Sequence, residues 1–453
     1  MKYNPAFRPA RVPFMSNPSP LQFQVQTLVD SAMALMARGQ HDEAEQVFNK
    51  VLEAAPYHRD ALNFLATRAY GRGELSRCVE LLEKAVRTKP DDRVLRENLA
   101  VAYVDEGKPA EALEQFDRVL ELKPGDLDAT LYKGHLLERS GKPADALEQY
   151  ARACITAGNV NTYLQSSIWP VRMKELLRRA VAAIMNELRR KIAAGLEPVH
   201  AGHPGADFSR VDACVLGFVG GRLERPDALQ RPSLLYFPGL STKPFYERSE
   251  IPESRVLEEA GSAVLAEYSA LQAESAQFSP YVQAPSNQDP QQWRELNNSP
   301  AWSAYHLYRN SERSAESCEA CPETARVMES LPLARIPGHA PEVFFSVLKP
   351  GTHIPSHFGL GNYKLAVHLP LVLPGDCSIR VGNETRSWEE GKCLIFDDSF
   401  QHEAWNRSER PRVVLILDIW HPELHEHERA AIVAVLDAIG AFRQRYGLEF
   451  FKT

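Results

Sequence analysis

The stretch YKLAVHLPLVL, residues 363–373, alternates apolar and polar side chains as a β-strand does. A strand has a side-chain period of two, which predicts one face made of Tyr363, Leu365, Val367 and Leu369, and an opposite face made of Lys364, Ala366 and His368. A strand that turns Lys and His away from its apolar face indicates that this second face meets either solvent or a polar pocket.

Further strand-like segments lie on both sides of this one. Runs rich in Val, Ile, Leu and Phe, separated by turn residues, occupy residues 343–348, 378–382, 393–396 and 412–419. Several strands without intervening helices are typical of an antiparallel barrel or jelly roll. Residues 424–445 have helical spacing and are expected to cover one sheet face.

Three polar side chains in this region are candidates for chemistry. A His two residues ahead of an Asp or Glu is typical of non-heme iron sites, but His357 is followed at that spacing by Gly359. His357 and His402 are expected on loops at neighbouring strand ends, where they either converge on a ligand or form polar surface. Arg412 begins an apolar strand, and a buried guanidinium needs an anion, either a protein carboxylate or a dicarboxylate ligand.

A repeat of 34 residues precedes this region. The phrases GQHDEAEQVF, GELSRCVELL, GKPAEALEQF and GKPADALEQY begin at glycines 39, 73, 107 and 141. Small residues follow each glycine at the fifth position, large ones follow at the ninth, and Pro56, Pro90 and Pro124 close three units. This pattern resembles the tetratricopeptide repeat, in which each unit is a pair of helices. Residues 21–160 are therefore predicted to form an α-solenoid whose concave face holds a peptide or a protein.

The remaining segments connect or flank these two parts. Residues 1–20 are expected to be a flexible tail, and residues 161–230 a helical cap followed by a linker, with the cap helix at about 170–195 and the Gly- and Pro-rich linker at about 196–232. The net charge of −7 gives no reason to expect nucleic acid as a partner. The sequence contains no apolar run long enough for a membrane span and no signal-peptide pattern, and its seven cysteines are scattered. These features favour a cytoplasmic protein.

Several ordered motifs resemble the aspartyl/asparaginyl β-hydroxylase family. They include FSVLKPGTHIPSHFGLGNYKLAVHLPLVLP, RSWEEGKCLIFDDSFQHEAWN and RVVLILDIWHPEL, with upstream likeness at LLYFPGL and around Trp302. The resemblance implies a dioxygenase domain at residues 231–453, dependent on Fe(II) and 2-oxoglutarate, with a double-stranded β-helix (jelly-roll or cupin-like) core. The fold class is then multidomain α + β, a solenoid followed by this barrel.

The resemblance also implies roles for individual residues. His357 and His402 would ligate the iron as the only protein ligands. Arg412 would bind 2-oxoglutarate, supported by Ser346 and His368. Lys364 and Trp302 would contact the substrate. Asp398 would orient either Lys364 or a substrate amine, and the alternative is that it caps a turn. The protein-hydroxylating relatives in the family have Arg at the positions of Lys364 and Ala366, so this pocket departs from theirs.

The expected substrate is the Asp- or Asn-like β-carbon of a side chain in a peptide or protein. A small molecule or acyl chain, and a non-catalytic repeat scaffold, are the alternatives.

Overall fold

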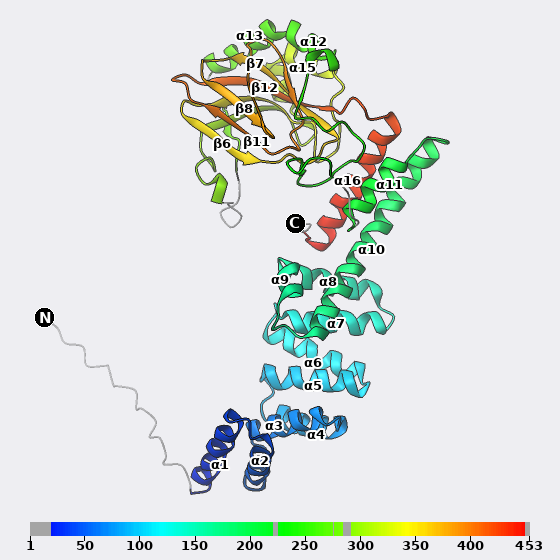
Figure 1. The fold of residues 1–453 in the computed structure, drawn as a ribbon, viewed down its shortest axis with the longest axis vertical. Coiled ribbons are helices and arrows are strands. Elements are labelled where there is room, and N and C mark those ends of the chain that lie inside the picture. Colours follow the sequence, from blue (N-terminus) through cyan, green and yellow to red (C-terminus); the bar gives the residue numbers. More distant parts are fainter. Residues whose placement is uncertain (1–19, 221–224, 275, 284–290, 449–453) are drawn as a thin grey trace, which may run out of the picture. The chain divides into compact units, whose positions relative to one another are not determined.

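The computed structural model describes residues 20–220, 225–274, 276–283 and 291–448, and Figure 1 shows their course. Within them the chain forms two compact units, one comprising residues 20–184 with 446–448 and the other residues 185–445. The predicted flexible tail lies outside the described residues, except Pro20, at which the first helix begins.

The first unit consists of helix pairs, as the repeat predicted. The helices are α1 (Pro20–Ala37), α2 (His41–Ala54), α3 (Arg59–Gly71), α4 (Leu75–Thr88), α5 (Arg93–Glu106), α6 (Pro109–Leu122), α7 (Leu127–Arg139) and α8 (Pro143–Ala157). The repeated glycines stand in the turns within the pairs with φ between +73° and +79°, which explains their recurrence. The small residues that follow them, such as Ala44 and Ala112, are fully buried and let the helices approach closely.

Three more helices follow, α9 (Val160–Gln165), α10 (Val171–Gly202) and α11 (Ser209–Phe218). The apolar positions expected on the cap helix, from Met173 to Leu188, are buried. The linker prediction differs from the structure, because residues 196–202 continue α10 and α11 follows shortly after. Gly195 approaches the backbone of a later helix and Leu196 is buried, so packing sustains α10 through Pro198 despite its local cost.

The second unit is built on two antiparallel sheets. The larger has the strand order β1-β10-β7-β12-β5-β3-β2, with β4 paired to β3; the smaller has the order β6-β11-β8-β9. The strands of the larger sheet are β1 (Phe245–Tyr246), β2 (Ser279–Pro280), β3 (Trp302–Arg309), β4 (Glu312–Arg313), β5 (Val343–Leu348), β7 (Lys364–Val372), β10 (Leu394–Phe396) and β12 (Arg412–Trp420). Those of the smaller sheet are β6 (Thr352–His357), β8 (Cys377–Val381), β9 (Glu384–Ser387) and β11 (His402–Asn406).

The two faces of the larger sheet have different partners. On β7, the face with Leu365, Val367 and Leu369 packs on the short helices α12 (Ser254–Glu259), α13 (Gly261–Ala273), α14 (Ala315–Ala320) and α15 (Pro322–Glu329). The opposite face contributes Ala366 to a second core shared with Ile379 and Ala404 of the smaller sheet. The predicted alternation of residues 363–369 is therefore confirmed.

Antiparallel β-structure is confirmed as well, and so is the helix expected at 424–445, α16 (Glu426–Tyr446). The expectation that this helix covers a sheet face was wrong: neither core described above contains a residue of α16, and Ala434 of α16 lies against Gly195 of α10. The described strands form two sheets and no closed barrel. The double-stranded β-helix stays a prediction.

Candidate functional site between the two sheets

His357 and His402 lie side by side. His357 ends β6 and His402 begins β11, so both stand on strands and not on the loops that the sequence suggested. They are direct cross-strand partners in the antiparallel ladder, and their ring centroids are 4.0 Å apart. Because cross-strand partners share one face of a sheet, the pairing aims both imidazoles the same way.

Both imidazoles are prepared to donate a lone pair. Nδ1 of His357 donates to the Pro355 carbonyl at 2.8 Å, and Nδ1 of His402 donates to the Phe400 carbonyl at 2.9 Å. A carbonyl can only accept, so Nδ1 carries the proton and Nε2 the lone pair. Burial lowers the pKa of His357 to about 3, helped by its neighbour His402, and burial lowers the pKa of His402 to about 4. Two neutral rings fixed by carbonyl hydrogen bonds fit a divalent metal ion such as Fe(II).

No third protein ligand joins them in the part of the chain that the structure describes, where no group of three His, Cys, Asp or Glu side chains is arranged to hold a metal. At the position two residues after His357, a Cβ on Gly359 would overlap the carboxylate of Asp398. A side chain therefore cannot be added at 359 unless Asp398 moves.

Arg412 is the second feature of the site. It is 1% exposed, and burial lowers its pKa to about 10. Nη2 donates to Ser346 Oγ at 3.3 Å, Nε has no partner, and no carboxylate of a described residue pairs with the guanidinium. A buried cation without a counter-ion is costly, so this geometry fits a carboxylate that is bound from solution.

His368 stands beside Arg412. Trp388 lies under the guanidinium, 5.0 Å from ring centroid to Cζ, and its Nε1 donates to Nδ1 of His368 at 3.3 Å. Burial, followed by the charge of Arg412, lowers the pKa of His368 well below its usual value. His368 is therefore neutral and carries its proton on Nε2, where it can donate a hydrogen bond.

The histidine pair and Arg412 belong to one closed ring of contacts between the sheets. On one side, the rings of His402 and Phe396 are 5.7 Å apart, those of Phe396 and His368 are 4.9 Å apart, and Trp388 contacts both His368 and Arg412. On the other side, Arg412 and Trp302 both donate to Ser346 Oγ, Trp302 through Nε1 at 3.0 Å. Trp293 lies 6.3 Å from Trp302 and 5.2 Å from His357, and His357 contacts His402, which closes the ring. Six of the predicted site residues therefore meet around one mostly aromatic wall: Trp302, Ser346, His357, His368, His402 and Arg412.

Lys364 and Asp398 form a separate polar cluster with Asp418. Lys364 Nζ donates to Asp398 Oδ2 at 2.7 Å and to Asp418 Oδ1 at 2.8 Å. Lys364 and Asp418 are each 5% exposed. Burial alone would lower the pKa of Lys364, but the charges of Asp398 and Asp418 raise it well above its usual value. The lysine is thus a charged member of a buried triad.

We expect Lys364→Met to destabilise the second unit by about 3–5 kcal/mol, because two buried carboxylates would lose their counter-charge. Denaturant titration followed by tryptophan fluorescence measures the change. Lys392→Met is the matched control: its 3.3 Å ion pair with Glu258 is about half exposed on the lysine side, so its loss should cost less than about 1 kcal/mol. Equal costs in the two variants would contradict the triad as a buried, mutually dependent unit.

Sequence reasoning missed Asp418, Trp388 and Trp293. The sequence could have indicated Asp418, because Arg412 and Asp418 are an even number of positions apart on β12 and therefore share a face. The two tryptophans lie outside regular strands, and no local pattern marks them.

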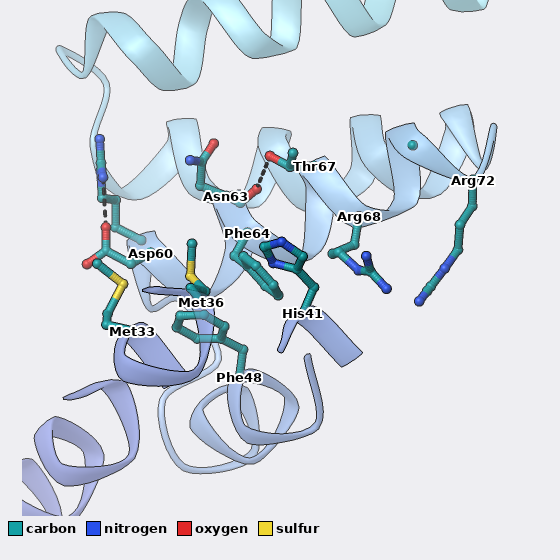
Figure 2. A pocket seen from close by; sticks show the side chains of 12 residues that line it. Met33, Met36, His41, Phe48, Asp60, Asn63, Phe64, Thr67, Arg68 and Arg72 are labelled. Atoms are coloured by element: carbon teal, nitrogen blue, oxygen red, sulfur yellow. Dashed lines mark hydrogen bonds and ion pairs between the residues drawn. The ribbon is translucent and has the colours of Figure 1, made fainter. Parts of the chain in front are cut away.

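A second concave feature lies in the repeats. A cavity of about 620 Å³ is lined by side chains of α1, α2 and α3, among them Met36, Phe48, Phe64 and Arg68, and by Arg72 directly after α3. Figure 2 shows these side chains. Among the described residues, no helix is long and apolar enough to cross a membrane.

Sequence comparisons agree with this division of the chain. Residues 258–422 match the family profile described as aspartyl/asparaginyl beta-hydroxylase, and residues 35–100 and 97–161 match tetratricopeptide repeat profiles.

Three relatives illustrate the match. Human aspartyl/asparaginyl beta-hydroxylase is 40% identical over 135 residues, which are 30% of this chain and 18% of that protein. Human aspartate beta-hydroxylase domain-containing protein 2 is 32% identical over 219 residues, or 47% of this chain and 57% of that protein. The chain thus spans only part of the length of these two relatives.

The match to the third relative covers most of that protein. Ornithine lipid ester-linked acyl 2-hydroxylase from Rhizobium tropici is 30% identical over 240 residues, which are 50% of this chain and 81% of the relative. Its name states that it acts on a lipid. Together with the profile match, this coverage of 81% of a relative shows that the chain belongs to the aspartyl/asparaginyl beta-hydroxylase family, with tetratricopeptide repeats ahead of the hydroxylase domain.

Proposed function

We propose that this chain is an Fe(II)- and 2-oxoglutarate-dependent hydroxylase of a side chain in a peptide or protein, and that its two facing sheets are a double-stranded β-helix. The observation that carries the proposal is the buried, unpaired guanidinium of Arg412 in the same ring of contacts as two neutral, paired histidines. A dicarboxylate cosubstrate requires a cation that has no carboxylate partner, and iron requires side chains that can bind a metal.

Each residue then has a task. His357 and His402 would hold the metal through Nε2, and Arg412 with Ser346 would bind the far carboxylate of 2-oxoglutarate. His368 would donate its Nε2 proton to a cosubstrate oxygen. Iron, 2-oxoglutarate and O₂ together supply the oxidising chemistry that places a hydroxyl on an unactivated carbon. The aromatic wall of Trp293, Trp302 and Phe396 would exclude water from that reaction.

The direct test is release of succinate from 2-oxoglutarate by the purified protein with and without Fe(II). We expect iron-dependent release that a suitable peptide accelerates, together with a gain of one oxygen atom in that peptide by mass spectrometry. Absence of both 2-oxoglutarate binding and iron-dependent release would contradict the proposal.

Hydroxylation of an acyl chain is the second candidate. It is favoured by the apolar character of the wall and by the acyl hydroxylation that the name of the Rhizobium relative states. A gain of one oxygen in an ester-linked acyl chain and in no peptide would select it.

We further propose that the repeats hold a long peptide substrate, for which the cavity on α1–α3 offers mixed apolar and basic contacts (Figure 2). A chain that begins at residue 185 keeps the whole second unit, including α11, whose Arg210 is hydrogen-bonded to Gly239 and Glu428. We expect it to bind iron and 2-oxoglutarate normally but to hydroxylate a long peptide at least about tenfold more slowly, because remote contacts no longer orient the substrate.

Rates for the full and the shortened chain on long and short versions of the same peptide measure this effect. The short peptide is the control, since it should not distinguish the two proteins. Equal rates on the long peptide would leave the repeats as a docking module without a role in substrate orientation.

A further inference from the structure

The charges beside the histidine pair bear on what kind of substrate group enters the site. β7 turns three side chains toward the smaller sheet, those of Lys364, Ala366 and His368. His368 is neutral and Ala366 is apolar. Any recognition of a substrate carboxylate by this face would therefore depend on Lys364.

Lys364 is already neutralised. Its ammonium donates to one oxygen of Asp398 and one of Asp418, at 2.7 and 2.8 Å. Asp418 also accepts from the Glu342 backbone N–H through its second oxygen, at 3.0 Å, whereas Asp398 Oδ1 is buried without any partner. The single ammonium of Lys364 is thus shared by two buried carboxylates, and burial raises the pKa of Asp418. Lys364 therefore has no charge left to pair with a further carboxylate.

This triad is next to the place where a substrate group would meet the histidines. Ala366 is the cross-strand partner of Asp418 on one side and of Phe396 on the other, and Phe396 contacts His402. Asp398 touches Gly359, two residues after His357. The surface beside the histidine pair therefore consists of a methyl group, a phenyl ring and a triad whose one cation is already paired with two carboxylates.

We propose that the substrate group that enters this site is uncharged, so that the enzyme accepts amide or apolar side chains and rejects carboxylates. The proposal rests on the function proposed above. There, Arg412 is used by 2-oxoglutarate, and Lys364 is already paired with Asp398 and Asp418, so a substrate carboxylate would find no free cation on this face. Burying an unpaired charge is unfavourable, whereas an amide of the same shape avoids that cost.

The test uses peptides that differ only at the central residue, in a mixture with randomised flanking positions. Asp and Asn form one matched pair and Glu and Gln another, and Leu represents apolar side chains. With Fe(II) and 2-oxoglutarate present, mass spectrometry of the gain of one oxygen gives relative rates. We expect the uncharged member of each pair to react at least about tenfold faster. An Asp peptide that reacts as fast as its Asn partner would overturn the inference while leaving the hydroxylase in place, whereas loss of iron-dependent succinate release would overturn the proposed function itself.

A variant tests the cause of the preference. Asp418→Asn removes one of the two carboxylates paired with Lys364 and keeps an oxygen for its ammonium. Lys364 is then freer to pair with a substrate carboxylate, so the ratio of Asn to Asp rates should fall by about tenfold. Glu342→Gln is the matched control: it removes the same charge from a neighbouring backbone position, but its carboxylate contacts Asn310 and His306 and not Lys364. An unchanged ratio in Asp418→Asn would overturn the proposed role of the triad. If that variant does not fold, the ratios of the natural chain still decide the inference.

Discussion

His357→Ala and His402→Ala are each expected to lower Fe(II) affinity by more than about 100-fold and to abolish hydroxylation at limiting iron. The reason is that the proposed iron site has these two histidines as its protein ligands and no third His, Cys, Asp or Glu of the described residues joins them, so each variant leaves one. Changes in the groups that merely orient metal ligands already cost 10- to 100-fold in affinity, and removal of a ligand should cost at least as much. Iron binding by calorimetry under anaerobic conditions measures the effect independently of turnover.

His353→Ala is the matched control for both variants. His353 also lies on β6, but it pairs with Glu403 at 2.8 Å and stacks on Trp405, away from the histidine pair. It should retain normal iron affinity and activity. Full activity of either His357→Ala or His402→Ala at limiting iron would refute the two-histidine site.

Arg412→Ala is expected to weaken 2-oxoglutarate binding by about 100- to 1,000-fold, since loss of one member of a buried charge pair typically costs 2–5 kcal/mol. Arg412→Lys should restore only part of the affinity, because an ammonium lacks the planar fork that matches a carboxylate. Direct titration of 2-oxoglutarate gives the dissociation constants. Arg407→Ala, which removes an exposed arginine over Trp405, is the control and should bind normally.

Arg412 also leads to an expectation about stability. Without 2-oxoglutarate the guanidinium is buried and unpaired, so Arg412→Met should unfold at the same or a higher temperature than the natural chain. Adding 2-oxoglutarate should raise the unfolding temperature of the natural chain and leave that of Arg412→Met unchanged. A large loss of stability in Arg412→Met, together with undiminished binding of 2-oxoglutarate, would show that Arg412 is a structural residue.

Local sequence patterns predicted the secondary structure correctly where the same requirement on a residue recurs at a fixed spacing. The 34-residue spacing predicted the helix pairs because each turn needs a glycine with positive φ and each helix contact needs a small residue such as Ala44. The alternation in residues 363–369 predicted the two faces of β7, because one face meets helices and the other meets a second sheet. Gly and Pro residues wrongly predicted a linker at 196–202, because packing around Gly195 and Leu196 outweighs the low helix propensity of this segment.

The sequence by itself therefore determined that the chain has a repeat solenoid and an antiparallel β unit, and which histidines and arginine were candidates for chemistry. Only the tertiary structure decided that His357 and His402 are cross-strand partners, that Arg412 has no carboxylate partner among the described residues, and that Asp418 joins Asp398 in neutralising Lys364. Secondary structure follows from interactions between near neighbours in the chain. The site depends on which strands pair and in which register. Residues from 34 positions apart (Lys364 and Asp398) to 66 positions apart (Ser346 and Arg412) meet there only because both sheets bury their apolar faces at once.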